Sequence, residues 1–135
     1  GVAITDVIRA VRKIMLEVQY EMAPASLRSA IGNLSSEGNP GGGEKSKRAA
    51  WAESLGIQPY SPETHDVLYS PCCVLAYDTK LGSVARATAT VLRSTGASFG
   101  LLGEKESCCG ESVRKAGHEA LFESLARSNL ARKRG

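Results

Sequence analysis

The sequence predicts an α/β fold, in which a helical N-terminal connector precedes a β-α-β-α unit with short parallel strands. Residues 1–60 carry apolar residues at helical spacing and no strand-like run. From Asp66 onward, short apolar runs alternate with longer segments of helical spacing. Strands that alternate with helices in this way are typical of a parallel sheet.

A first helix is predicted near the start of the chain. Thr5 is a suitable N-cap, and Asp6 favours the positive end of the helix dipole. The apolar residues recur with a period of 3.6 residues, so they form one face that we expect to pack in a core. This face comprises Ile4, Val7, Ile8, Val11, Ile14, Met15 and Val18.

Two further helices are expected before the strands. Pro24 suits a first helical position, and the helix after it should turn Leu27, Ala30, Ile31 and Leu34 inward. Another helix is predicted over 44–55, where Trp51 and Leu55 are four residues apart and can share a face.

The glycine-rich stretch 38–46 between these helices superficially resembles a phosphate-binding P-loop. The P-loop pattern requires glycine directly before Lys-Ser, and Glu44 occupies that position here. We therefore predict a flexible loop without a phosphate site.

The second half of the chain has the strands. Val67-Leu68-Tyr69 reads as a short buried strand closed by Pro71, and Ser98–Leu102 as a second one. The residues Leu81, Val84, Ala85, Thr88, Val91 and Leu92 mark an amphipathic helix between them, with Gly96 placed to end it. A last helix is predicted over 113–130.

The four cysteines occur as two adjacent pairs, each of which follows a predicted strand. Ligands bind outside the carboxyl ends of strands in open α/β sheets, so the two pairs should converge. Clustered thiolates repel unless a metal neutralises them, and they select zinc, copper(I) or iron–sulfur centres. Plain core packing stays open as an alternative, above all for Cys72, because free cysteine is often buried.

Two stretches resemble the CCG cysteine-rich domain family, which includes the catalytic subunit of heterodisulfide reductase. The stretch 69–78 is similar to the opening of that domain, and 104–111 is similar to its Cys-Cys-Gly motif. The resemblance implies that Cys73, Cys108 and Cys109 are ligands of a 4Fe–4S centre, in some members a noncubane one. Cys72 stands where the family usually has glycine, and the later Cys-x-x-Cys of the motif does not occur in this chain.

The same resemblance implies a domain organisation and a cellular role. Residues 1–60 would be the connector after a ferredoxin-type domain, and 61–135 the N-terminal half of a CCG domain, so we expect the chain to be a fragment. The expected function is that of an iron–sulfur electron-transfer component of a heterodisulfide reductase-like oxidoreductase. Flavoprotein or quinone-linked subunits are the implied partners.

Two other functions remain open at this stage. A thiolate zinc site would make the chain a structural module without redox activity. A dithiol switch would use Cys108 or Cys109 as a nucleophile of low pKa near the following helix.

Composition limits the binding partners and the cellular location that we expect for this chain. Aromatic residues make up only 5% of the chain and the net charge is +3, so nucleic-acid binding is not expected. No apolar run approaches the ~20 residues of a membrane span. Adjacent cysteines are a poor disulfide framework, which favours a reducing cytoplasm, with any membrane attachment made through partners.

Overall fold

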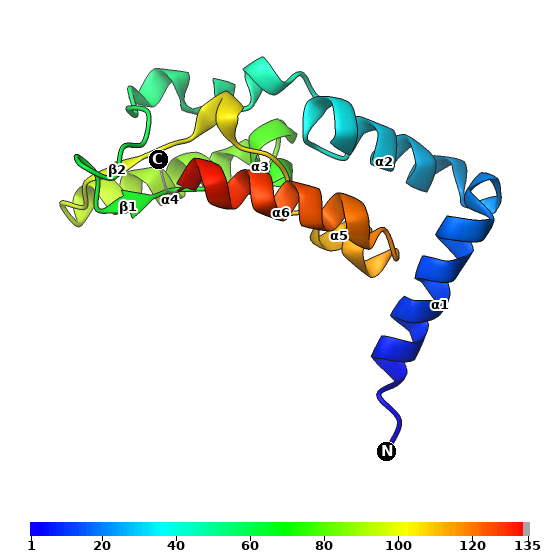
Figure 1. Ribbon diagram of the computed structural model, residues 1–135. Helices are drawn as coiled ribbons and strands as arrows, with labels where there is room; N and C mark the ends of the chain where they lie inside the picture. The colour runs from blue at the N-terminus through cyan, green and yellow to red at the C-terminus, as the bar shows by residue number, and fades with distance from the viewer. Residues whose placement is uncertain (134–135) are drawn as a thin grey trace.

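The computed structural model describes residues 1–133, and its second half has the predicted order of strands and helices (Figure 1). The strands β1 and β2 pair in parallel, with Val67 opposite Phe99 and Leu68 opposite Gly100, which confirms the α/β class. Arg134 and the end of the predicted 61–135 module lie outside the described residues. The elements of this half are β1 (Val67–Leu68), α3 (Cys73–Tyr77), α4 (Gly82–Ser94), β2 (Phe99–Gly100), η4 (Gly103–Lys105), α5 (Glu111–Lys115) and α6 (Glu119–Lys133).

The segment around Pro59 extends this small sheet, which the sequence pattern did not indicate. Pro59 forms a parallel bridge with Leu101, and the Tyr60 amide donates to the Leu101 carbonyl at 2.9 Å. A Cβ atom on Gly100 would lie 2.6 Å from the Tyr60 Cα. The absence of a side chain at Gly100 therefore makes room for this crossing segment.

One hydrophobic core forms where η3 (Ala50–Leu55) and α4 meet the sheet. Ala85 and Ala89 are buried on α4, and their small side chains allow close packing. The predicted face of this helix is wrong in part, because Leu81, Val84 and Val91 are exposed. The buried residues of this core are Trp51, Ala52, Ala85, Ala89, Phe99 and Leu101, and Leu55 packs against them.

A second core joins α2 (Ala25–Glu37) to the cysteine region. Ile31 and Leu34 are buried as predicted, and Leu27 is partly buried beside them. Their partners in this core are Cys108, Val113 and Leu125. The helix that follows Pro24 is thus part of the support for the second cysteine pair.

Three predictions for local structure are wrong. The segment 44–55 forms two 3-10 helices, η2 (Lys45–Lys47) and η3, although Trp51 and Leu55 still share a core. Helix α1 (Ile4–Val18) follows Ala3 and has no side-chain cap bond, so Thr5 does not cap it. The predicted last helix is broken into α5 and α6 at Gly117, whose φ of 102° is not helical, and a Cβ atom there would lie 2.5 Å from the Arg12 carbonyl carbon.

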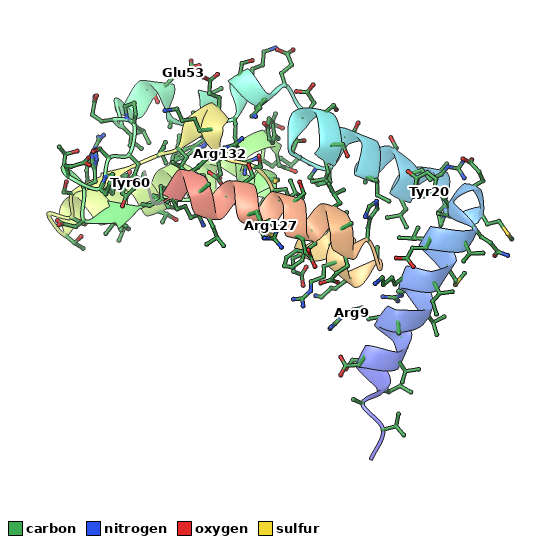
Figure 2. The ribbon with its side chains drawn as sticks, viewed as in Figure 1. Arg9, Tyr20, Glu53, Tyr60, Arg127 and Arg132 are labelled. Atoms are coloured by element: carbon green, nitrogen blue, oxygen red, sulfur yellow. The ribbon has the colours of Figure 1, made fainter. Side chains whose placement is uncertain are left out.

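Helix α1 has no buried residue, so the prediction that its apolar face packs in a core is wrong. The helix extends away from the rest of the molecule (Figure 1). The Arg12 guanidinium donates to the Lys115 carbonyl at 3.0 Å, and Figure 2 shows Arg9 on the side of α1 that faces the body. Met15, on the apolar face, is 56% exposed. A short 3-10 turn, η1 (Tyr20–Met22), connects α1 to α2.

No helix among residues 1–133 has the length and hydropathy of a membrane span.

Candidate metal centre

The structure brings the two cysteine pairs together. All four cysteines line one cavity of about 430 Å³, which Arg48 also lines. Cys73 is half-buried and Cys108 is buried, whereas Cys72 and Cys109 are exposed. The convergence predicted from the parallel strands is therefore observed.

The first pair is placed by the end of β1. The chain leaves the strand through Ser70 and the buried Pro71, and Cys72 then occupies the N-cap position of α3. Cys73 is the first residue of that helix. The two cysteines therefore differ in environment although they are adjacent in sequence.

The second pair is placed by a tight turn before α5. Gly110 has φ 76°, in the left-handed region that favours glycine, and its amide donates to Cys108 Sγ at 3.4 Å. A Cβ atom at this position would lie 3.1 Å from Leu125 Cδ1. The Cys108 amide in turn donates to the Gly38 carbonyl at 2.7 Å. The glycine-rich stretch after α2 is thus bonded to the cysteine turn.

Asn129 of α6 fixes the segment before the turn. Its Nδ2 donates to the carbonyls of Ser107 at 3.2 Å and Cys108 at 3.0 Å, and the Ser107 amide donates to its Oδ1 at 3.1 Å. The Asn129 side chain thus supplies hydrogen-bond partners to buried backbone groups that have no strand partner. Sequence reasoning missed Asn129, because its burial is visible only in the structure.

The Cys73 side chain packs against the buried cluster that contains Cys108, and both side chains line the same cavity. The neighbouring Cys108 thiol lowers the pKa of Cys73 to about 6, and the positive charge of Arg48 lowers it further, against the opposing effect of burial. The pKa of Cys108 is raised, because the neighbouring Cys73 sulfur and burial both favour its protonated form.

These shifts bear on the dithiol alternative. That alternative expected Cys108 or Cys109 to have a low pKa, and for Cys108 the expectation is wrong. The pKa of Cys73, at the other strand end, is the one that is lowered.

A buried ion pair lies beside the Cys73 sulfur. Arg48 Nη2 is 2.9 Å from Glu106 Oε1, and the two side chains are 2% and 7% exposed. Arg48 Nη1 donates to Cys73 Sγ at 3.5 Å, and Ser70 Oγ donates to Glu106 Oε1 at 2.7 Å. Burial alone would lower the pKa of Arg48, but Glu106 and then Cys73 outweigh it, so this side chain stays charged. Sequence reasoning missed both members of the pair, because they are 58 residues apart.

The cysteine side chains are the right type of ligand for a thiolate-bound metal centre, but they provide only part of its ligand set. Thiolates are soft ligands, and the Cys73 thiolate faces a cavity with more sulfur around it. Among residues 1–133, however, no group of three His, Cys, Asp or Glu side chains is arranged to hold one metal ion. Cys109 lines the cavity without completing such a group. Any centre here would need a movement of Cys109 or donors from other chain segments.

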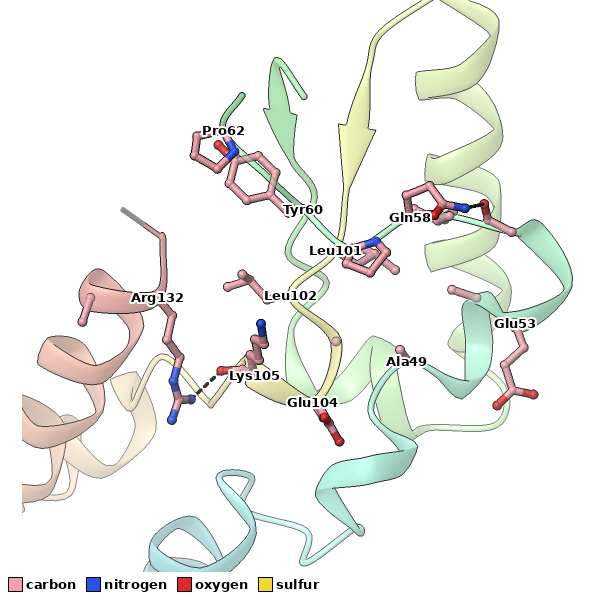
Figure 3. A pocket seen from close by; sticks show the side chains of 16 residues that line it. Ala49, Glu53, Gln58, Tyr60, Pro62, Leu101, Leu102, Glu104, Lys105 and Arg132 are labelled. Carbon is pink, nitrogen blue, oxygen red and sulfur yellow. Dashed lines mark hydrogen bonds between the residues drawn. The ribbon is translucent and has the colours of Figure 1, made fainter. Parts of the chain in front are cut away.

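A larger cavity of about 740 Å³ lies away from the cysteines (Figure 3). It is lined mainly by apolar residues of the segment 56–62 and by Leu101 and Leu102. At its edge the Arg132 guanidinium donates to the Lys105 carbonyl. No cysteine is among its lining residues, so this cavity is separate from the thiol site.

Comparison with known proteins gives a family and several relatives. The family described as "CCG: Cysteine-rich domain" matches residues 67–134. The chain is 31% identical to an EtfAB:quinone oxidoreductase of Syntrophomonas wolfei over 79% of its own length and 16% of the relative's. It is also 31% identical to a probable membrane-anchored ferredoxin of Chromohalobacter salexigens, over 85% of the chain and 17% of the relative. A probable iron-sulfur-binding oxidoreductase FadF of Bacillus subtilis is 28% identical, over 93% of the chain and 19% of the relative.

The chain therefore spans less than one fifth of the length of these relatives. No solved structure matches it.

Proposed function

This chain belongs to the CCG cysteine-rich domain family, and on that premise we propose that it supplies thiolate ligands to an iron–sulfur centre in an electron-transferring oxidoreductase. The observation that carries the proposal is the shared cavity, which Cys73 and Cys108 both line although they follow different strands. The names of the relatives, an oxidoreductase, a ferredoxin and an iron-sulfur-binding oxidoreductase, support the same chemistry.

The proposed ligands are Cys73, Cys108 and Cys109, with Cys72 as a bystander. Cys73 packs against the cluster that contains Cys108, and Cys109 adjoins Cys108 in the same turn. The remaining ligands would come from a Cys-x-x-Cys outside this chain, and the group held would be of the 4Fe–4S type. Such a centre supplies one-electron transfer, while the protein sets its potential and access.

The proposed place of the chain in the whole protein follows the same resemblance. Residues 1–60 would connect a ferredoxin-type domain to a CCG domain, of which 61–135 form the first half. Electrons would pass through the centre to a flavoprotein or quinone-linked partner, in the cytoplasm or at a membrane to which partners attach the protein. The name EtfAB:quinone oxidoreductase supports this relay more than a heterodisulfide reductase-like reaction.

Metal analysis of the complete protein, purified without air, tests the proposal. We expect iron and acid-labile sulfide in comparable amounts and a brown absorption spectrum. Cys108→Ser should lose most of the iron, whereas the matched control Cys72→Ser should keep it. A colourless protein that contains zinc would replace the proposal with a structural zinc site, and equal iron loss in both variants would refute the ligand assignment.

A second experiment tests whether this chain is sufficient. The isolated residues 1–135 should not retain a cluster after reconstitution with iron and sulfide followed by desalting, because three thiolates do not complete the ligand set. A stable, stoichiometric iron–sulfur spectrum from this segment would contradict the need for outside ligands.

One observation favours a dithiol switch as the second candidate function. Cys73, whose pKa is lowered, lines one cavity with the Cys108 thiol, and a thiolate near a second sulfur is what thiol–disulfide exchange requires. A metal-free but redox-active protein, in which oxidation joins Cys73 to Cys108, would favour this alternative.

A further inference from the structure

Arg48 contacts the sulfur of a proposed ligand, and its position is determined by both cysteine-bearing segments. Its partner Glu106 precedes Cys108 by two residues, and Ser70, which donates to Glu106, precedes Cys73 by three. The guanidinium thus contacts the acid of one segment and the sulfur of the other. It lines the cavity together with the thiols.

Stability gives no reason for this arrangement. A buried ion pair is weak evidence of stabilisation, because apolar residues of similar volume often serve as well. The pair also leaves a defect, since Arg48 Nε is buried and has no hydrogen-bond partner among residues 1–133. A charged group retained at such a cost is more readily explained by what it does to the neighbouring sulfur.

We infer that Arg48 is a positioning residue that raises the reduction potential of the iron–sulfur centre by donating an N–H hydrogen bond to the Cys73 sulfur. The inference rests on the proposed function and assigns to this side chain a role that the ligand set alone does not include. Glu106 holds the guanidinium in place, with Oε1 at 2.9 Å from Arg48 Nη2, and its negative charge opposes the effect of Arg48 on the potential.

The redox step is a single electron transfer. An external low-potential reductant is oxidised by one electron, the centre is reduced by one, and no proton moves and no bond to the protein changes. The added negative charge spreads onto the ligand sulfurs, so a fixed cation and a hydrogen bond at sulfur stabilise the reduced form more than the oxidised form. Removal of the cation should therefore lower the potential, and removal of the Glu106 charge should raise it.

The test is a reductive titration of the complete, cluster-loaded protein, followed by absorption or electron paramagnetic resonance. Arg48→Met should lower the equilibrium constant for one-electron reduction about tenfold, which corresponds to a reduction potential lower by about 59 mV. Glu106→Gln keeps an acceptor for Arg48 and removes the charge, so it should shift the potential the other way. Arg127→Met is the matched control, because it removes the same charge from a side chain that is 82% exposed and screened by solvent.

Arg48→Lys covers the case in which Arg48→Met does not retain iron. Lysine keeps the charge but lacks the fork that reaches Glu106 and Cys73 together, so its potential should lie below that of the unmodified protein. Shifts of opposite sign at Arg48 and Glu106 support the inference, because a merely structural pair would not separate them. Wild-type potentials in Arg48→Lys and Glu106→Gln, or shifts no larger than that of Arg127→Met, would overturn it.

These outcomes are distinct from failure of the proposed function. If the unmodified protein holds no iron–sulfur centre, the proposed function itself is refuted. If it holds one and the variants do not move its potential, only the role of Arg48 is refuted.

Discussion

Helix α1 and the Arg48–Glu106 pair place apolar and charged side chains in the opposite of their usual positions. The helix leaves its aliphatic face exposed, whereas an arginine and a glutamate are buried between the cysteine-bearing segments. The comparison shows that burial depends on partners and not on residue type alone. Nothing within residues 1–133 covers the face of α1, while Arg48 and Glu106 each supply the charge that the other needs.

The largest expected effect comes from breaking the buried pair. Glu106→Leu in the metal-free chain should lower the free energy of unfolding by about 3–5 kcal/mol, because it leaves the Arg48 charge buried without its partner. The double variant Arg48→Met/Glu106→Leu should recover most of that loss. Urea unfolding followed by circular dichroism measures both, and a double variant no more stable than the single one would show that the pair is stabilising in itself.

The cysteine turn should be the next most sensitive site. Gly110→Ala should destabilise the chain by about 3 kcal/mol, since it combines a strained backbone with crowding against Leu125. Gly96→Ala is the matched control, because Gly96 has the same φ of 76° and a Cβ atom there meets nothing within 4 Å. It should cost about 1 kcal/mol. Equal losses in the two variants would mean that contact with Leu125 has no effect.

The charge on Cys73 gives a smaller, pH-dependent effect in the metal-free protein. Its thiolate is the nucleophile, so alkylation in a Cys72→Ser/Cys109→Ser background should rise with pH through a midpoint of about 6 and then level off. Cys108→Ala removes the largest cause of the lowered pKa, so the midpoint should move to higher pH. Iodoacetamide kinetics with mass spectrometry measure this midpoint. An unchanged midpoint in Cys108→Ala would argue against an effect of the Cys108 thiol on the pKa of Cys73.

The smallest effect should be on α1. Ile14→Ala should change the free energy of unfolding by less than about 0.5 kcal/mol, because Ile14 is 58% exposed. Leu34→Ala is the buried counterpart at 2% exposure and should cost about 2–5 kcal/mol. A loss at Ile14 as large as that at Leu34 would show that the apolar face of α1 is covered in solution.

The strands and helices that depend on local sequence pattern could be predicted from the sequence. The parallel pairing of 67–68 with 99–100, the helix over 82–94 and the inward face of α2 were all predictable from periodicity and breakers. The approach of Cys73 to Cys108 followed from strand order. The segments 44–55 and 113–130 were predicted as continuous helices and are not, because packing against neighbouring segments overrides helical spacing there.

The sequence by itself determined the order of strands and helices, the family and the pair of strand ends at which cysteines converge. Only the tertiary structure decided which groups surround the thiols. Arg48, Glu106 and Asn129 reach the site from segments far apart in the chain, and no local pattern links them. It also decided that α1 stays outside the core, because an amphipathic period defines a face but not the surface against which that face packs.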